Sequence, residues 1–179
     1  AYDLSQVDSR LIGDTFNVVL ERTVREIKGQ SCITLHDFME PKKQIMVSRS
    51  FGKSIRSKSI LSEAISFHAS RAAEKLRYEK QKCRLITAFI RSNRFNTRVR
   101  QIYAAKSFEL VHPTDDTRII IKNANRILDQ IFADGYQYAK AGVLLSDFTN
   151  RYGYQMSLFD KKRDEKMASK LMQTVDYIN

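Results

Sequence analysis

The alternation of strand and helix periodicity between residues 44 and 148 constrains the fold of this chain more than any other feature. Runs rich in β-branched and aromatic residues predict strands over 44–50, 83–91, 107–112 and 140–148. Apolar residues at helical spacing predict a long helix over 59–80 and a second helix between Thr114 and Gly135. The order β-α-β-β-α-β favours an α+β fold, a four-stranded sheet with two helices on one face. The other face of the sheet would then be free to bind a partner.

The boundaries of these elements are expected to follow capping residues and breakers. The apolar stripes of the two helices consist of Leu61, Ile65, Ala69, Ala72 and Leu76 in the first and Ile120, Ala124, Ile127 and Ile131 in the second. Thr114 is expected to cap the second helix, with Asp115 and Asp116 in its first turn, because acids there complement the helix dipole. The pair Phe51-Gly52 is expected to break the first strand.

Segments on both sides of this sheet domain are expected to be separate parts of the chain. A helical pattern over 15–28 stops at Gly29, and Pro41 with its charged neighbours is typical of a linker. We therefore predict a helical segment at 1–40, a sheet domain at 41–150 and a C-terminal segment at 151–179. The last segment carries a weak helical stripe, formed by Met167, Leu171, Val175 and Ile178.

Positive charge is concentrated in one region. The formal net charge is +11; residues 42–106 contain 17 Lys and Arg against three acids, whereas the rest of the chain contains 14 against 17. The whole excess therefore lies in one region, which includes an arginine-rich stretch at 92–106 that we expect to be an exposed connection. Such a region creates a positive potential suited to phosphates. It predicts a polyanionic partner, with nucleic acid first, against the alternative of a merely soluble basic surface.

Residues that carry catalytic or metal chemistry do not form a recognisable pattern. The three histidines are isolated, and Cys32 and Cys83 are far apart, so neither a metal site nor a disulfide framework is predicted. Asp115-Asp116 is better explained by a helix N-terminus than by a metal pair. No apolar run approaches the about 20 residues that span a bilayer. We expect a non-catalytic, cytoplasmic protein without a membrane partner.

A hexapeptide near the end of the chain has the composition of a docking peptide. Its sequence is Gln155-Met156-Ser157-Leu158-Phe159-Asp160. The glutamine amide both donates and accepts hydrogen bonds, and Leu158-Phe159 offers an anchor that a partner's groove could bury. The segment resembles the sliding-clamp-binding peptide of bacterial DNA polymerases, with Met156 in the place of the usual leucine. The alternative is a short apolar strand or turn after Gly153.

Several further motifs occur in the order found in one polymerase family. They are Ser48-Arg49-Ser50-Phe51-Gly52-Lys53-Ser54, Arg71-Ala72-Ala73-Glu74-Lys75-Leu76-Arg77, Asp115-Asp116-Thr117-Arg118 and Tyr138-Ala139-Lys140-Ala141-Gly142-Val143. With the hexapeptide, they resemble the little finger domain of Y-family translesion DNA polymerases of the UmuC-like type, the DNA polymerase V catalytic subunit and its relatives. Residues 18–26 look like the last thumb helix of the same proteins, so the resemblance covers most of the chain.

This resemblance implies a function for the chain and for a longer parent. The parent would be a nucleotidyl transferase that copies past lesions with Mg²⁺ during the SOS response to DNA damage. Its catalytic carboxylates would lie in a palm domain that has no counterpart here, so this fragment would bind and recruit without catalysis or a cofactor of its own. The implied partners are a DNA primer-template, a sliding clamp, a UmuD-like subunit and a recombinase filament.

Two sets of residues are the candidate sites. The first is predicted to hold DNA phosphates, from the matching motif for Arg49, Ser50, Gly52 and Lys53 and from charge and position alone for Arg56, Arg91, Arg94 and Arg100. The second is the clamp-binding set, Gln155, Met156, Ser157, Leu158 and Phe159. No metal ligands are predicted.

The main alternative function is an RNA-binding module, because a basic sheet of this order also serves that purpose. Such modules stack bases on aromatic residues in the middle of two strands. The run 84–91 has only Phe89, and the first strand has no such residue. A nuclease would need clustered carboxylates for metal ions, and the basic region has almost none.

Overall fold

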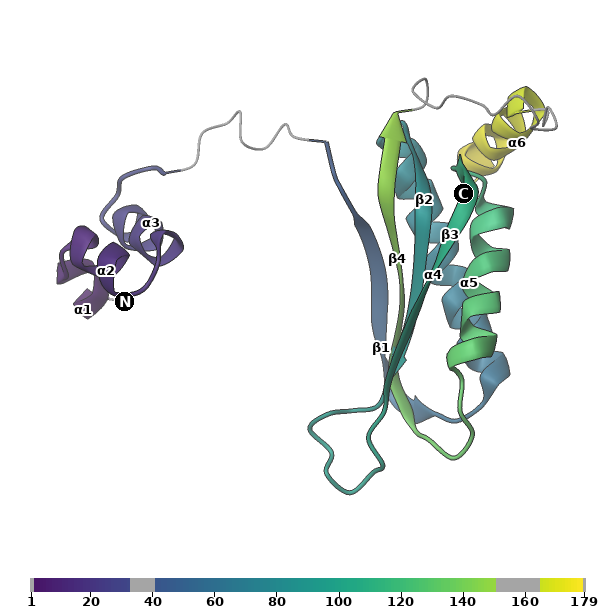
Figure 1. Ribbon diagram of the computed structural model, residues 1–179, viewed down its shortest axis with the longest axis horizontal. Coiled ribbons are helices and arrows are strands. Elements are labelled where there is room, and N and C mark those ends of the chain that lie inside the picture. Colours follow the sequence, from purple (N-terminus) through teal and green to yellow (C-terminus); the bar gives the residue numbers. More distant parts are fainter. Residues whose placement is uncertain (1, 33–40, 151–164, 179) are drawn as a thin grey trace. The chain divides into compact units, whose positions relative to one another are not determined.

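The computed structural model describes residues 2–32, 41–150 and 165–178 (Figure 1). The chain divides into two compact units, Ala1–Pro41 and Lys42–Asn179. The clamp-binding set at 155–159 lies outside the described residues. Within the described ranges, no helix is both long enough and apolar enough to cross a membrane.

The second unit contains one antiparallel four-stranded sheet. Its strands are β1 (Ile45–Ile55), β2 (Gln81–Arg91), β3 (Tyr103–Thr114) and β4 (Tyr138–Asn150). Their spatial order is β1-β4-β2-β3, so β1 and β3 form the two edges. The helices α4 (Lys58–Tyr78) and α5 (Thr117–Ile131) follow β1 and β3 and pack on the same face, as Figure 1 shows. The predicted α+β fold and the order β-α-β-β-α-β are confirmed.

The core lies between this face and the two helices. The predicted stripe residues of both helices are all buried, from Leu61 to Leu76 in α4 and from Ile120 to Ile131 in α5. They pack on alternate residues of the strands, among them Ile45, Ile86 and Leu145. The apolar residues of the helices, which recur about every 3.6 residues, thus pack against apolar residues that alternate along each strand. This is the pattern that predicted the fold.

All four strands extend beyond their predicted ranges, and β1 and β3 do so at a predicted break and a predicted connection. Phe51-Gly52 does not break β1, because the strand continues to Ile55 with an irregular register after Ser50. An edge strand tolerates a glycine at such an irregularity, since no second neighbour needs its backbone groups. β3 begins at Tyr103, within the predicted connection, and contains Pro113, which an edge strand also tolerates.

The N-terminus of α5 also differs from the prediction. Its cap is Asp116, not Thr114, and neither Asp115 nor Asp116 lies in the first turn. The Asp116 carboxylate accepts a hydrogen bond from the Arg118 backbone N–H at 2.9 Å, while the Thr114 hydroxyl accepts one from the Asp116 N–H at 3.2 Å. The carboxylate is the better acceptor for the orphan N–H groups of the helix, so the start moves two residues along the chain.

The described part of the first unit contains three short helices, α1 (Tyr2–Gln6), α2 (Ser9–Thr15) and α3 (Val18–Ile27). The predicted helix over 15–28 corresponds to α3 alone, because the Asn17 side chain caps it by accepting from the Leu20 N–H. Gly29 ends α3 as predicted, with a φ of 85° that suits glycine.

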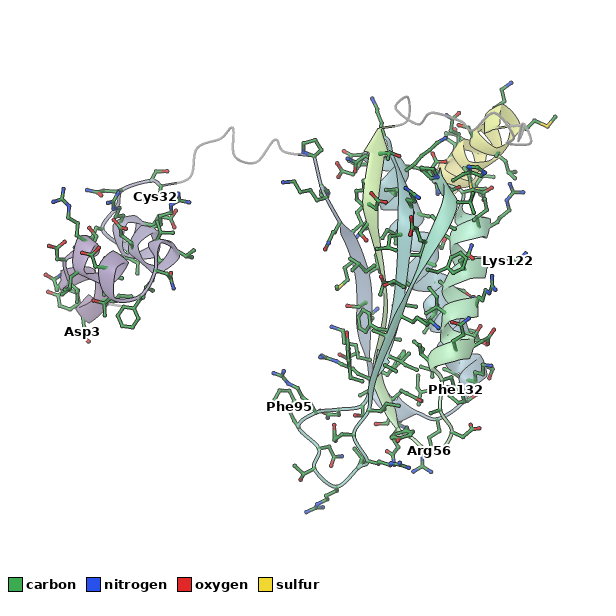
Figure 2. The ribbon with its side chains drawn as sticks, viewed as in Figure 1. Asp3, Cys32, Arg56, Phe95, Lys122 and Phe132 are labelled. Carbon is green, nitrogen blue, oxygen red and sulfur yellow. The ribbon has the colours of Figure 1, made fainter. Side chains whose placement is uncertain are left out.

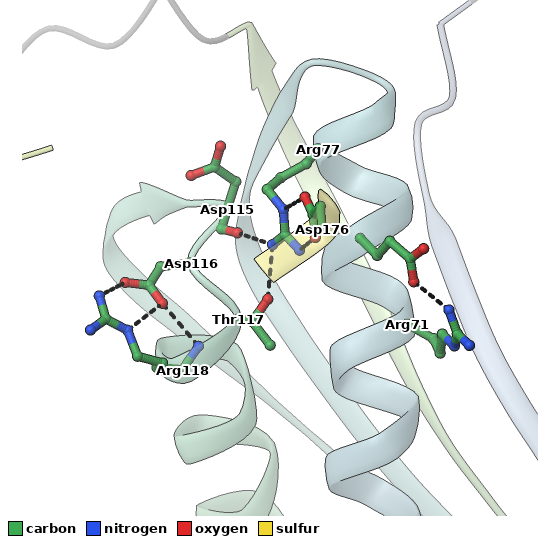
Figure 3. A network of polar contacts seen from close by, with 8 residues as sticks. Arg71, Arg77, Asp115, Asp116, Thr117, Arg118 and Asp176 are labelled. Atoms are coloured by element: carbon green, nitrogen blue, oxygen red, sulfur yellow. Dashed lines mark hydrogen bonds and ion pairs between the residues drawn. The ribbon is translucent and has the colours of Figure 1, made fainter. Parts of the chain in front are cut away.

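The C-terminal helix α6 (Glu165–Ile178) completes the second unit. Met172 is buried in α6, whereas all four residues of the predicted stripe, Met167, Leu171, Val175 and Ile178, are exposed. Asp176 of α6 pairs with Arg77 at the end of α4 (Figure 3).

Candidate nucleic-acid interface

Strand pairing determines which residues share the face without helices. Residues directly opposite one another in a sheet point to the same side. The row Ile45, Leu145 and Ile86 belongs to the core, so the neighbouring rows project from the other side, here called the open face. Three such rows cross the sheet: Met46-Leu144-Thr87-Ser107, Ser48-Gly142-Phe89-Ala105 and Ser50-Lys140-Arg91-Tyr103.

The last of these rows places two positive charges side by side. Lys140 and Arg91 are directly opposite on the two central strands, and both are half-buried. Like charges in this position repel one another, because opposite Cβ atoms are only about 5 Å apart. Neither side chain forms an ion pair with any residue in the described part of the chain. An external anion at this row would relieve the repulsion.

A loop at the same end of the sheet adds more arginines. It joins β2 to β3 over residues 92–102 and projects beyond the ends of the strands (Figure 1). The Gln101 side chain holds it in shape by donating to the carbonyl oxygens of Asn93, Asn96 and Val99 at 2.8–3.2 Å. The Ser92 hydroxyl donates to the Gln101 Oε1 and accepts from the Ile102 N–H. The arginines of the loop are therefore attached to a backbone that these hydrogen bonds hold in shape.

Two of these arginines lie over aromatic rings. The guanidinium carbon of Arg94 is 4.8 Å from the centroid of Phe95, and that of Arg100 is 4.6 Å from the centroid of Tyr136. Stacking of this kind orients a guanidinium while leaving its N–H donors available. In Figure 2, Phe95 and Arg56 mark this end of the sheet, here called the basic end. Its members are Lys53, Arg56, Arg91, Arg94, Arg98, Arg100 and Lys140.

Several basic residues elsewhere in the unit are paired with acids. Lys58 pairs with Asp129, Arg71 with Glu74, Arg77 with Asp176 and Arg118 with Asp116. By contrast, none of the seven cations of the basic end has an acidic partner among residues 2–32, 41–150 and 165–178. Seven cations without an acidic partner in the described ranges therefore lie at one end of the sheet, where they create a field that attracts polyanions.

The middle row of the open face contains a ring packed flat on the sheet. A Cβ atom on Gly142 would lie 2.5 Å from the Phe89 ring and 2.5 Å from the Ser48 Cβ, so only glycine leaves room for this ring. Phe89 is consequently only 9% exposed. It is therefore no free platform for a base, and this geometry gives no support to the RNA-binding alternative.

The predicted phosphate-binding residues fall into three places. Ser50 and Arg91 share the open-face row with Lys140, and Arg94 and Arg100 lie in the ordered loop. Gly52, Lys53 and Arg56 are exposed at the end of β1 and just beyond it.

Arg49 is separated from this group. It is opposite Ala141, which in turn is opposite Ile90, so it belongs to the helix side of the sheet. There its charge helps to lower the pKa of His68 in α4. A role for Arg49 in binding stays a prediction, but the structure does not bring it to the open face.

Two residues of the interface were not among the predicted set. Lys140 begins the predicted last strand, and Tyr103 lies in the stretch that was predicted to be a connection. The pair Ile102-Tyr103 is β-prone and could have extended the third strand. Their position beside Arg91 depends on the register, which the sequence alone does not specify.

Among the described residues, no group of three or more His, Cys, Asp or Glu side chains could hold a metal ion. Cys83 is fully buried, and burial raises the pKa of its thiol to about 12, so it stays protonated and acts as a packing residue. Cys32, by contrast, is partly exposed.

Comparison with known proteins is consistent with these features. Residues 42–158 match the impB/mucB/samB family C-terminal domain. The whole chain is 45% identical to Protein SamB and 44% identical to Protein ImpB, both of Salmonella typhimurium. It is 42% identical over 177 residues to Protein MucB of Escherichia coli. The chain spans 42% of the length of each of these relatives.

Proposed function

The chain belongs to the impB/mucB/samB family, whose C-terminal domain it contains, and from this premise we propose that it grips DNA for an error-prone translesion DNA polymerase. In this proposal it holds the primer-template by its phosphates and recruits a sliding clamp during SOS damage bypass. The resemblance of its motifs to Y-family little fingers supports this reading. The described residues provide no metal-binding cluster, so no catalytic step is assigned to them.

The observation that carries the proposal is the Arg91-Lys140 pair. Two half-buried cations face each other on an open sheet face, and neither has an acidic partner within the described ranges. Such a pair lowers the stability of the free sheet, which an anion would restore. A phosphate bound there would also accept hydrogen bonds from the Ser50 hydroxyl in the same row.

Contacts to phosphates suit a protein that must accept damaged templates. They position a duplex without reading its bases, so sequence preference should be weak. The exposed Gly52 has open space around its Cα, which allows a sugar-phosphate backbone to approach the end of β1. The arginines of the loop extend the charged surface beyond the sheet.

Recruitment of the clamp is proposed for the hexapeptide and rests on its sequence. Gln155, Leu158 and Phe159 would occupy the groove of the clamp, with Met156 and Ser157 between the anchors. Contacts with a UmuD-like subunit and a recombinase filament are proposed from the family resemblance, without assigned residues. Magnesium-dependent nucleotidyl transfer would be the work of the longer parent polymerase.

DNA binding can be tested by titrating a fluorescent primer-template with the chain at several salt concentrations. The logarithm of affinity should fall with the logarithm of salt, with a slope of about −0.9 for each duplex phosphate neutralised. Arg91→Ala and Lys140→Ala should each weaken DNA binding. Each should also make the slope of log affinity against log salt shallower by about 0.9, the value for one phosphate contact. Both variants should unfold at the same temperature as the original chain or higher, because a repulsion is removed.

Arg118→Ala is the matched control, since it removes the same charge from an exposed arginine that is already paired with Asp116. It should change the slope little. A flat salt dependence, or an equal loss in Arg118→Ala, would contradict the proposal. Tighter binding to duplex RNA than to duplex DNA would favour the RNA-binding alternative instead.

A further inference from the structure

Exposed aromatic rings accompany the cations of the basic end. Tyr103 is 70% exposed and Phe95 is 79% exposed, although both are large and apolar. A shallow hollow lies beside them, lined by Arg91, Ser92, Arg94, Gln101, Ile102 and Tyr103. We propose that this hollow binds an unpaired nucleotide of the DNA, with its base stacked on Tyr103 and its phosphate on Arg91 and Arg94. The inference rests on the proposed DNA binding and adds a second kind of contact to it.

The Tyr103 ring is held in position from one side. Its centroid is 6.5 Å from that of Phe89, with the two planes at 37°, and Phe89 itself lies on Gly142. A nearly buried ring thus supports an exposed one. Such support lowers the conformational entropy that Tyr103 would lose when a ligand stacks on it.

Hydrogen bonds also hold the loop residues that line the hollow. Gln101 donates to three carbonyl groups of the loop, and Ser92 bonds to both Gln101 and the Ile102 N–H. Arg94 lies over the Phe95 ring, which leaves its planar cation at the rim. An ordered wall with two arginines and an exposed ring is the combination by which proteins hold single-stranded nucleic acid.

The geometry favours an unpaired nucleotide over a base pair. Bases inside a duplex are stacked on both faces, so only an unpaired base offers a free face to a ring. Tyr103 is the first residue of the edge strand β3 and is directly opposite Arg91 on β2. The backbones of two neighbouring strands are about 4.8 Å apart. A nucleotide with its phosphate on Arg91 can therefore reach the ring with its base.

The test uses the whole chain and three fluorescent DNA probes. They are a blunt duplex, the same duplex with about six unpaired nucleotides at one 5′ end, and a duplex whose overhang is abasic. The two overhangs carry the same charge and differ only in their bases. The chain should bind the overhang with bases roughly tenfold more tightly than the abasic one, the effect expected of one stacked base.

Tyr103→Ala should abolish this preference, because its affinity for the overhang with bases should fall to its affinity for the abasic overhang. Tyr103→Phe should retain it, because the ring and not the hydroxyl makes the contact. Tyr78→Ala is the matched control: Tyr78 is 87% exposed at the end of α4, next to the start of β2 rather than its end at Arg91.

Each contrary result has a separate meaning. Equal affinity of the original chain for the two overhangs would overturn the inference, and so would an equal loss on all three probes in Tyr103→Ala. Absence of salt-dependent binding to the blunt duplex would overturn the proposed function itself. The blunt probe thus separates the two failures.

Discussion

At the scale of single residues, His68 is the most unusual side chain of the core. It is 4% exposed in α4, and neither ring nitrogen has a hydrogen-bond partner within the described part of the chain. Burial lowers the pKa of His68 below its ordinary value of 6.5, and the nearby charge of Arg49 lowers it further. The imidazole is therefore neutral in the folded protein at neutral pH.

This burial predicts a loss of stability in acid. The unfolded chain takes up a proton at His68 near pH 6.5, whereas the folded chain resists it. Stability that is present above this pH is therefore lost as the pH falls towards the lowered pKa of the folded state. Urea denaturation at about pH 7 and about pH 5 should show the loss, and His68→Leu should reduce it. His112→Leu, at an exposed position, is the control; an equal change in both variants would contradict the assignment.

Residue types alone do not predict which residues are neighbours in the open-face row. Periodicity identified the buried stripes because each depends on spacing within one element. The row of Ser50, Lys140, Arg91 and Tyr103 depends on the register of three strand pairs, and that register follows from tertiary packing. Arg49 and Ser50 are adjacent in sequence and lie on opposite sides of the sheet for the same reason.

At the scale of secondary-structure elements, Arg77 connects three helices, α4, α5 and α6. Its side chain is 9% exposed and donates to the Asp176 carboxylate of α6 through two nitrogens. It also donates to the Asp115 carbonyl and the Thr117 hydroxyl, both at 2.8 Å, at the start of α5 (Figure 3). One guanidinium thus fastens α6 and the cap region of α5 to the end of α4.

Two substitutions should separate these two connections. Asp176→Ala should release α6 alone and cost about 1 kcal/mol, because the carboxylate is partly exposed. Arg77→Ala should release α6 and also loosen the start of α5, since Asp115 and Thr117 lose a buried donor. Hydrogen exchange would measure both effects, as faster exchange in 165–178 alone or in 115–120 as well. Unchanged exchange of α6 in Asp176→Ala would contradict the role of the ion pair.

Element order was more predictable than element ends. Stripes and β-prone runs suffice for the order β-α-β-β-α-β, which is confirmed. The ends depend on competition between neighbouring groups, such as Thr114 and Asp116 for the cap of α5. They also depend on edge position, which lets β1 pass through Gly52 and lets β3 include Pro113.

At the scale of the whole chain, the sequence concentrates positive charge in 42–106 and the fold concentrates it further. Ion pairs engage Lys58, Arg71, Arg77 and Arg118 on the helices. The seven cations of the basic end, by contrast, have no acidic partner in the described ranges. Lys140, from outside the basic stretch of the sequence, joins them through strand pairing. Charge counting thus predicts a polyanionic partner, and the topology determines which part of the sheet such a partner would contact.

The proposed clamp anchor is far from this surface in the sequence, so the two activities should be separable. Replacing Leu158 and Phe159 with alanine should abolish binding to the sliding clamp, because the groove loses both apolar anchors. Affinity for the primer-template should stay within about twofold, since no phosphate contact is removed. Met156→Leu is the positive control: it restores the usual form of the peptide and should bind the clamp at least as tightly. Surface plasmon resonance on immobilised clamp and on DNA would measure both affinities, and a parallel loss of both in the double variant would mean that the segment serves folding instead.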